Sequence, residues 1–396
     1  MNQNIALVAP TIFDGMQLLK ESAILLKNDL IEAIIPLQNI PSSYSIKEYR
    51  GTLLPGFIDL QVNGGGGILF NDAPNLLGIS QILKAHRARG TAALLPTLIT
   101  ATDEVIKRGL EAVSEGMEKK LPGLLGIHIE GPMINPERKG IHKADNIRLL
   151  SDEMIDLIAS YTEIPRLITL APEMVPLPII EKLTQSGAII FAGHTECPPD
   201  LLHRAIAAGV KGFTHLYNAM PQMSSRNPAT TGYAIQSKES YVSIINDTFH
   251  VDPLMVKLAY QSKPKGKLFI VSDAMSSIGS DQKSFYLDDQ QIYVDQGRLT
   301  NNQGTLAGAH IDMACSILNA IDLLDIPLEE ALALGTSIPA TLIYQKDQKE
   351  QKSSRNYGFL QKGAPAYINL LKEGVITPLN FESCPSTQAN SDFEMG

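Results

Sequence analysis

Short apolar runs alternate with amphipathic stretches along most of the chain. Eight runs of mainly aliphatic residues fit buried strands, at residues 53–62, 92–98, 124–130, 167–170, 188–192, 212–216, 242–246 and 268–272. Between most of them the apolar positions recur at helical spacing, as in residues 79–88, 103–119 and 198–208. Thr102 and Ser151, each followed by two acidic residues, fit helix N-caps. Eight strand–helix units predict an α/β protein built on a (β/α)8 barrel.

The regions on either side of this alternation have a different hydrophobic pattern. Residues 1–52 contain short apolar runs separated by turn-like Asp-Gly and Lys-Asn-Asp segments, which predicts part of a small β domain. We expect the barrel to occupy residues 53–344, with an insertion of hairpin character at 281–305 and helices at 312–324 and 328–334. A polar loop follows at 345–356. Residues 357–378 return to strand and turn texture and would complete the small domain, and the polar tail 379–396 is expected to be disordered.

Composition excludes several classes of protein. Of 396 residues 44% are hydrophobic and the mean hydropathy is zero, which is typical of a globular protein. The net charge of −9 and the absence of a basic run argue against nucleic-acid binding. No apolar run approaches the roughly 18 residues of a membrane span, and no secretory signal pattern opens the chain. Three scattered cysteines follow neither zinc nor disulfide spacing. A cytoplasmic location is therefore expected.

The candidate metal-binding and catalytic residues lie where the predicted strands end. Glu130 closes a strand just before a Gly-Pro break, and His194 and His215 close two later strands. Because the carboxyl ends of barrel strands share one mouth, these three side chains predict a metal site. The same reasoning brings in Gln61 and Asn63 after strand one, His250 after strand seven and Asp273 after strand eight.

Three protein ligands leave room for a water, which indicates a catalytic rather than a structural metal. Asp273 would exchange protons with the water and the leaving amine, and His142 would help polarise a carbonyl oxygen. A solvent-facing loop histidine is an equally good interpretation of His142. His128, on the same face as Glu130, is expected to support the site from one layer below. His86 and His203 lie on predicted helices and are assigned no role.

Several segments resemble a known family. Leu-Pro-Gly-Phe-Ile-Asp at residues 54–59 is similar to the opening of the amidohydrolase superfamily barrel. Six further segments, in order, resemble the N-acetylglucosamine-6-phosphate deacetylase family: His-Ile-Glu-Gly-Pro at 128–132, Leu-Ala-Pro-Glu-Met at 170–174, Ala-Gly-His-Thr at 192–195, Thr-His-Leu-Tyr-Asn-Ala-Met at 214–220, Phe-His-Val-Asp at 249–252 and Gly-Thr-Leu-Ala-Gly at 304–308. The resemblance spans about residues 53–340.

The resemblance implies a barrel with a small β-sandwich built from both chain termini, usually as a homodimer. It implies deacetylation of N-acetylglucosamine 6-phosphate in amino-sugar catabolism and cell-wall sugar recycling. It also implies that Glu130, His194 and His215 bind a divalent metal and that Asp273 is the acid/base. The implied substrate-binding residues are Gln61, Asn63, Ile141, His142, Asn218, Ala219, Arg226, His250, Leu306, Ala307 and Gly308. Arg226 would cap the phosphate, reaching the neighbouring subunit's active site, which suits a guanidinium at a loop tip.

The chain departs from the family pattern at three places. The superfamily's His-x-His on strand one is Gln61-Val62-Asn63, and neutral amides are poor metal ligands. We therefore expect one Zn²⁺ or Fe²⁺ per subunit. His310 stands where small hydroxyl residues are common, and residues 363–367 lack the usual Ala-Asp-Leu.

Two other functions compete with this one. The chain could be another amide hydrolase of the superfamily, or a non-catalytic sugar-phosphate-binding barrel. Arg226 with Asn218-Ala219 favours a phosphosugar over the first. Retention of Asp273 with three metal ligands argues against the second.

Overall fold

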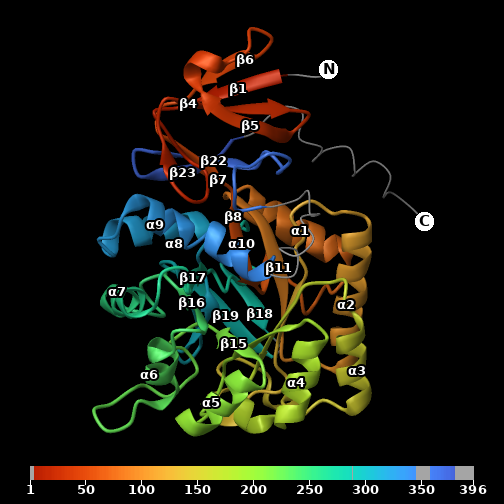
Figure 1. Ribbon diagram of the computed structural model, residues 1–396. Coiled ribbons are helices and arrows are strands. Elements are labelled where there is room, and N and C mark those ends of the chain that lie inside the picture. The colour runs from red at the N-terminus through yellow and green to blue at the C-terminus, as the bar shows by residue number, and fades with distance from the viewer. Residues whose placement is uncertain (1–3, 288, 345–356, 380–396) are drawn as a thin grey trace, which may run out of the picture.

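The computed structural model describes residues 4–287, 289–344 and 357–379. Its centre is one sheet of eight parallel strands in the order β17-β16-β15-β14-β13-β12-β11-β8 (Figure 1). The strands are β8 (Phe57–Val62), β11 (Thr91–Ile99), β12 (Ile127–Glu130), β13 (Arg166–Leu170), β14 (Ile189–Ala192), β15 (Val210–Phe213), β16 (Tyr241–Ile245) and β17 (Leu268–Val271). A parallel bridge between Val62 and Ala274 brings the two edge strands together, so the predicted barrel is confirmed.

Helices pack around this sheet, including those predicted at residues 79–88, 103–119, 198–208, 312–324 and 328–334. They are α1 (Leu76–Arg87), α2 (Asp103–Glu118), α3 (Asp152–Ser160), α4 (Leu177–Gln185), α5 (Pro199–Ala207), α6 (Ala229–Gln236), α7 (Pro253–Ser262), α8 (Met313–Leu323), α9 (Leu328–Ala333) and α10 (Ser337–Ile343), with short 3-10 turns at Leu37–Asn39, Pro136–Arg138, Ala144–Asn146 and Pro172–Met174. Thr102 and Ser151 are N-caps as expected, since their hydroxyl oxygens accept hydrogen bonds from Val105 N and Met154 N.

A second, smaller body consists of two β-sheets, of which one is built from the N-terminal part of the chain and the other combines strands from both ends. One sheet has the order β5-β4-β1-β6 and the other β23-β22-β7-β2-β3. The strands are β1 (Asn4–Val8), β2 (Thr11–Phe13), β3 (Leu18–Leu19), β4 (Ser22–Lys27), β5 (Leu30–Pro36), β6 (Ser45–Glu48), β7 (Thr52–Pro55), β22 (Ile368–Lys372) and β23 (Val375–Pro378). Residues such as Leu7, Ile24 and Ile368 share one apolar core. The predicted small β domain built from both termini is present.

The predicted strand at residues 53–62 is wrong in one respect, because the structure divides it in two. β7 pairs with β22 and β2 of the small domain, whereas β8 pairs with β11 of the barrel. Gly56 separates them, and a Cβ there would lie 2.5 Å from the Cβ of Ala92. Because the apolar run is uninterrupted, its pattern does not indicate that the two halves pair with different sheets. The domain boundaries given above stay a prediction.

The small domain lies at the amino ends of β8 and β11. Gly56 N donates to Tyr367 O, and Asn369 Nδ2 donates to the carbonyl oxygen of Gly90, just before β11. The opposite, carboxyl ends of the barrel strands are left to the loops and to the insertion. The insertion is a four-stranded antiparallel sheet of β18 (Ser284–Leu287), β19 (Gln290–Asp295), β20 (Arg298–Asn301) and β21 (Leu306–Ala309), which confirms its hairpin character. A two-stranded ribbon, β9 (Gly64–Gly65) with β10 (Ile68–Leu69), follows β8.

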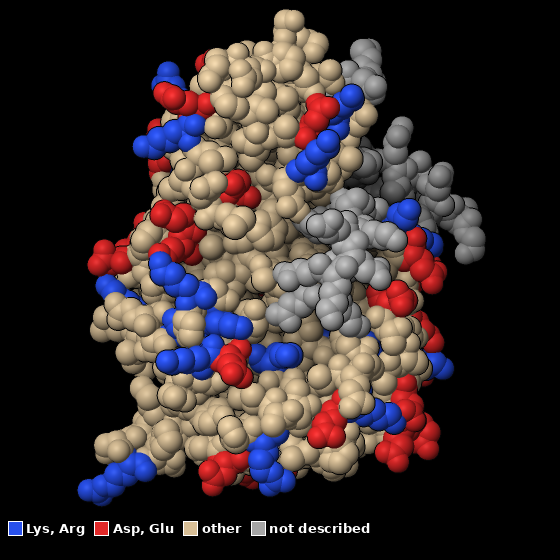
Figure 2. Space-filling model, viewed as in Figure 1, with Lys and Arg blue, Asp and Glu red and all other residues tan. Residues whose placement is uncertain are grey.

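The structure bears on some of the expectations drawn from composition and leaves others as predictions. Among the described residues no helix is both long and apolar enough to cross a bilayer. On the face in Figure 2, basic and acidic side chains are interspersed except at the left centre, where several basic side chains surround one acidic side chain. The predicted polar loop at 345–356 and all of the predicted tail except residue 379 lie outside the described residues. The expected cytoplasmic location stays a prediction.

Candidate active site

Four candidate residues lie at or just beyond the carboxyl ends of barrel strands. Glu130 is the last residue of β12, while His194, His215 and Asp273 each come two residues after β14, β15 and β17. The two histidines and Asp273 have positive φ values of 47°, 33° and 52°. This left-handed backbone is unfavourable for residues other than glycine and is found often at functional sites. The parallel ladder therefore brings together four side chains from distant parts of the sequence.

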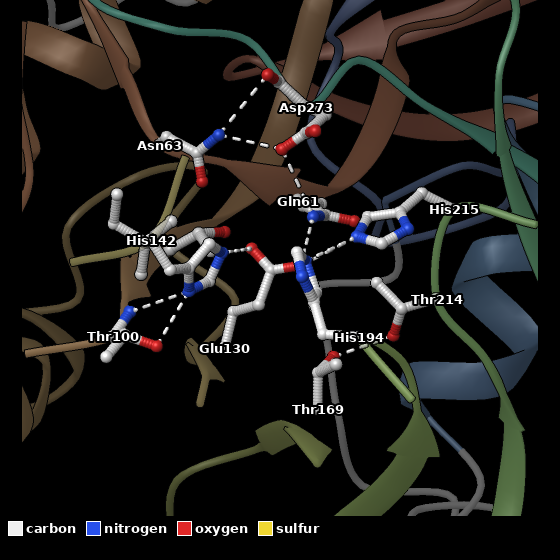
Figure 3. Close-up of polar contacts among 12 residues, drawn as sticks. Gln61, Asn63, Thr100, Glu130, His142, Thr169, His194, Thr214, His215 and Asp273 are labelled. Carbon is white, nitrogen blue, oxygen red and sulfur yellow. Dashed lines mark hydrogen bonds and ion pairs between the residues drawn. The ribbon is translucent and has the colours of Figure 1, made fainter. Parts of the chain in front are cut away.

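Glu130, His194 and His215 form a compact, buried cluster in which one potential ligand atom from each residue lies within 4.8 Å of the others (Figure 3). His215 Nε2 is 3.0 Å from Glu130 Oε1 and 3.0 Å from His194 Nε2. His194 Nδ1 is 2.7 Å from the carbonyl oxygen of Arg138, to which it donates, so the Nε2 lone pair faces the cluster. One carboxylate oxygen and two imidazole nitrogens at this spacing fit a single divalent metal site.

The electrostatics of the cluster match a site for a cation. Burial alone would raise the pKa of Glu130, but hydrogen bonds and charge from His194 and His215 hold that pKa well below its usual value. The carboxylate is therefore ionised although it is buried, which is costly unless positive charge compensates it.

Asp273 lies beside the cluster and contacts two amides of strand β8. Asn63 Nδ2 donates to Asp273 Oδ1 at 2.7 Å, and Gln61 Nε2 donates to the same oxygen at 3.1 Å and to Glu130 Oε1 at 2.9 Å (Figure 3). Burial, together with the negative charge of Glu130, raises the pKa of Asp273 to about 6. Gln61 and Asn63 thus use their N–H groups on carboxylates, in keeping with amides that donate hydrogen bonds rather than ligate a second metal.

His142 is buried next to the cluster and not in solvent. Thr100 N donates to His142 Nδ1 at 3.3 Å, and Thr100 Oγ1 is 2.7 Å from the same nitrogen. Because Nδ1 accepts, the proton of the neutral ring is on Nε2, which is 3.9 Å from Glu130 Oε2. Burial, followed by the neighbouring His194, lowers the pKa of His142 to about 3. The alternative of a solvent-facing loop histidine is therefore wrong.

Of the substrate-binding residues that the resemblance implies, those of segment 306–308 and Ile141 lie on one side of the metal cluster. β21, which carries Leu306, Ala307 and Gly308, runs alongside Ala274 through a parallel bridge at Ala309. Ala307 and Ile141 belong to one apolar cluster together with Met275, whose sulfur is 3.4 Å from Asn63 Nδ2. Gly308 has φ 78°, and a Cβ at this position would lie 2.4 Å from Met275. The insertion and the His142 loop thus meet beside Asp273.

The other implied substrate-binding residues, Asn218, Ala219, Arg226 and His250, are more dispersed. Asn218 and Ala219 come three and four residues after His215, and Thr195 N, next to His194, donates to Ala219 O. His250 Nδ1 is 2.6 Å from Asp247 Oδ2. Arg226 is exposed, and its side chain makes no hydrogen bond or ion pair within the part of the chain that the structure describes. The substrate contacts assigned to these residues stay predictions.

Sequence patterns missed several residues that the site depends on. Thr100 holds His142, and Asp247, which is 5% exposed, holds His250 and accepts backbone N–H groups of Phe249 and His250. His128 lies one layer below Glu130, as expected, but its ring nitrogens meet Thr97 and Thr169 rather than the cluster. His310 contacts Ser277, and both line a pocket of about 350 Å³ together with Arg89 and Asp247. Only the closeness of Asp247 to His250 in sequence could have drawn attention to that pair.

A parallel barrel with one carboxylate, two imidazoles and a nearby aspartate at its mouth is typical of a metal-dependent hydrolase. Comparisons with known proteins agree with this class. The chain is 41% identical over 293 residues to the N-acetylgalactosamine-6-phosphate deacetylase of Shewanella sp. (strain ANA-3), covering 74% of each chain. It is 32% identical over 342 residues to the N-acetylglucosamine-6-phosphate deacetylase of Haemophilus influenzae, covering 85% of this chain and 89% of the relative.

A solved structure gives the same answer. The fold superimposes on the crystal structure of N-acetylglucosamine-6-phosphate deacetylase from Pasteurella multocida with a TM-score of 0.88 and 32% identity, covering 95% of this chain and 97% of that one. No protein-family model matches the chain. The chain belongs to the N-acetylglucosamine-6-phosphate deacetylase family, and it is a carbon–nitrogen hydrolase of amino-sugar metabolism.

Proposed function

We propose that the protein hydrolyses the acetamide of N-acetyl-D-glucosamine 6-phosphate, releasing D-glucosamine 6-phosphate and acetate. The observation that carries the proposal is the buried Glu130–His194–His215 cluster with the Asp273 carboxylate beside it, in a chain of this family. A sugar-phosphate-binding barrel without activity would need neither an ionised buried ligand set nor an adjoining aspartate.

The chain's own residues divide the chemistry among them. Asp273, ionised above about pH 6, accepts the proton of the attacking water and returns it to the leaving nitrogen, which departs as an amine. His142, a neutral donor through Nε2–H, stabilises the negative charge that develops on the amide oxygen. Gln61 and Asn63 orient the Asp273 carboxylate. Met275, Ile141 and β21 provide the apolar side of the acyl pocket.

We propose Zn²⁺ or Fe²⁺ as the metal, one ion per subunit, held by Glu130, His194 and His215. Imidazole and carboxylate ligands suit both ions. When bound, the ion would supply an activated water and polarise the amide carbonyl.

The phosphate would bind away from this centre. We propose that Asn218 and the backbone of Ala219 hold the phosphate end, that His250 contacts the sugar, and that Arg226 of a second copy caps the phosphate in a homodimer. The exposure of Arg226 and its lack of a described partner support a role in contacts outside its own subunit. In Figure 1 the chain beside α6 extends away from the barrel, which would let it reach a neighbour.

A second candidate substrate is the C4 epimer, N-acetyl-D-galactosamine 6-phosphate. The relative with 41% identity is named for that activity, and 41% exceeds the 32% identity to the Haemophilus influenzae glucosamine enzyme. The acetamide and the phosphate are common to both sugars, so the metal cluster and Asp273 serve either one.

The deciding experiment is acetate release by metal-loaded protein. The substrates are the two phosphorylated epimers and unphosphorylated N-acetylglucosamine, compared by kcat/KM. We expect N-acetylglucosamine 6-phosphate to be preferred and the unphosphorylated sugar to be slowest. A higher kcat/KM for the galacto epimer would establish the second candidate. Phosphosugar binding with no acetate from any substrate would show a binding barrel without catalysis.

A further inference from the structure

Asp59 is a buried carboxyl group that the reaction described above does not use. It lies within β8, two residues before Gln61, and none of its surface is exposed. Burial raises its pKa to about 7. A carboxyl group in such a place is costly unless its oxygens are hydrogen-bonded, so its partners indicate what it does.

The partners of Asp59 bracket the proposed acid/base. Asp59 Oδ1 accepts hydrogen bonds from Gln61 N and from Ser272 N, each at 3.2 Å, and Asp59 Oδ2 accepts one from Ser272 Oγ. Ser272 Oγ in turn accepts a hydrogen bond from Ala274 N at 3.2 Å. A chain of hydrogen bonds thus runs from the interior of β8 to the residues on either side of Asp273.

Asp273 needs such support because of its backbone. Its φ of 52° is left-handed, which costs an aspartate free energy and persists only where the surroundings impose it. Asp273 N also donates to Gln61 O at 3.0 Å, and Asn63 N donates to Ala274 O at 2.9 Å. With the backbone held in this way, the Asp273 carboxylate meets the side-chain amides of Gln61 and Asn63 (Figure 3).

We propose that Asp59 and Ser272 are positioning residues, which act as one unit to hold residues 272–274 in the conformation that places the Asp273 carboxylate. Neither side chain belongs to the metal cluster, so the unit would affect turnover by placing the Asp273 carboxylate rather than by holding the metal. This inference rests on the proposed role of Asp273 as acid/base.

The first test is Ser272→Ala, which removes the hydroxyl that joins Asp59 to Ala274 N. We expect kcat to fall about 10-fold or more, since misplacing a catalytic group by about 1 Å can cost about 10²-fold. KM should stay within about twofold, and the protein should keep its metal, because no ligand is touched. The matched control is Ser316→Ala in α8, a fully buried serine whose hydroxyl has no partner among the described residues. It should retain the parent kcat.

The second test asks whether the two side chains act together. Asp59→Asn is isosteric, keeps an oxygen for the two backbone N–H groups and removes only the acceptor of the Ser272 hydroxyl. We expect a loss of a few-fold in kcat. Combined with Ser272→Ala, it should add little, because both changes break the same chain of hydrogen bonds. Losses that multiply would overturn the idea of one unit, and Asp59→Asn alone still tests the inference if Ser272→Ala does not fold.

Failure of this inference can be told apart from failure of the proposed function. If the parent and the Ser316→Ala variant are active but Ser272→Ala has an unchanged kcat, only the inference is overturned. If the parent hydrolyses none of the substrates, the proposed function is overturned, and crystal structures of the parent and of Ser272→Ala then decide the inference. It requires the Asp273 carboxylate to leave its hydrogen bonds with Gln61 and Asn63 in the variant. A carboxylate that has not moved would contradict it.

Discussion

At the scale of single residues, the most informative environment is that of Asp273. Its carboxylate oxygen accepts hydrogen bonds from two neutral side-chain amides, and the residue is half-buried. Burial favours its protonated form, while the two N–H donors keep the ionised form available. A carboxyl group with a pKa near the working pH can both take and give a proton, which is what hydrolysis of an amide needs.

Replacing Asp273 by Asn should therefore remove turnover but not binding. We expect kcat to fall about 10²-fold or more, in line with the contribution of general acid–base catalysis. Metal content and KM should change little, because Asp273 is outside the ligand set. The control is Asp281→Asn, an exposed aspartate just before β18, which should match the parent. Turnover of Asp273→Asn within a few-fold of the parent would exclude this residue as the acid/base.

The pH dependence of the parent enzyme follows from the same carboxyl group. Asp273 must be ionised to accept a proton, so kcat/KM should fall tenfold per pH unit below its pKa and level off above it. The pKa of about 6 sets an upper limit for this acid limb, since a divalent metal beside Asp273 would stabilise the carboxylate. The measurement is kcat/KM from pH 4.5 to 9. A rate that rises as the pH falls would contradict this assignment.

The metal count is also decided by single residues. Gln61 and Asn63 donate their amide N–H groups to carboxylates, and the three-ligand cluster is the only group of candidate ligands among the described residues. We expect full activity at one equivalent of Zn²⁺ or Fe²⁺ added to the apo-enzyme. Glu130→Gln should abolish binding at that site, because it removes the sole anionic ligand. Activity that saturates only at two equivalents would contradict a single site.

At the scale of elements, Arg166 joins two helices to the barrel from within. It begins β13 and is fully buried, and its guanidinium donates to carbonyl oxygens of Ile158 near the end of α3, of Ile164 in the loop that follows, and of Ser186 just after α4. Cations at helix C-termini satisfy carbonyl groups that have no partner within the helix. This end of β13 is opposite to the end that carries the active site.

Arg166→Met should destabilise the protein without affecting its chemistry. We expect the free energy of unfolding to fall by about 3 kcal/mol, because several buried carbonyl groups lose their donor. Steady-state kinetics below the unfolding transition should be unchanged. Lys182→Ala is the matched control, since the exposed Lys182–Asp156 pair also joins α3 to α4 and should contribute less than about 1 kcal/mol. Denaturant unfolding of both variants measures the difference, and equal losses would contradict a special role for Arg166.

At the scale of the whole molecule, the open question is whether one chain completes an active site. The metal cluster and Asp273 are formed within a single chain, whereas Arg226 projects from the surface without a described partner. A phosphate dianion needs a charge-assisted contact of this kind for tight binding. If the arginine that makes this contact belongs to a second copy of the chain, activity depends on the association of two copies.

Arg226→Ala should raise KM for the phosphosugar by about 10- to 10²-fold, the equivalent of a charge-assisted hydrogen bond. Slow hydrolysis of unphosphorylated N-acetylglucosamine should be unaffected. Arg204→Ala, which removes an exposed arginine of α5, is the control. Equal losses with both sugars would exclude a role in phosphate binding.

Mixing subunits tests whether Arg226 acts on a partner. Hybrids of Arg226→Ala and Asp273→Asn subunits would hold one site with both residues intact, so random mixing should restore roughly a quarter of the parent activity. No recovery after the subunits have been exchanged would show that Arg226 acts within its own chain or not at all.

The sequence by itself determined the barrel and the position of its chemical centre. Buried strands and amphipathic helices leave periodic patterns that depend only on local burial. In a parallel barrel every strand ends at the same mouth, so a glutamate or histidine at the end of an apolar run is placed without knowing its neighbours. Glu130, His194, His215 and Asp273 were found in this way, and the structure brings them together.

Only the tertiary structure decided how these side chains are held. Thr100 reaches His142 across 42 residues and Asp59 reaches Ser272 across 213, and no local pattern marks such pairs. The left-handed backbone of Asp273 and the change of sheet at Gly56 are likewise imposed by partners remote in sequence. Periodicity reports which face of an element is buried, whereas hydrogen bonds between elements depend on strand register and on side chains that meet only when the barrel closes.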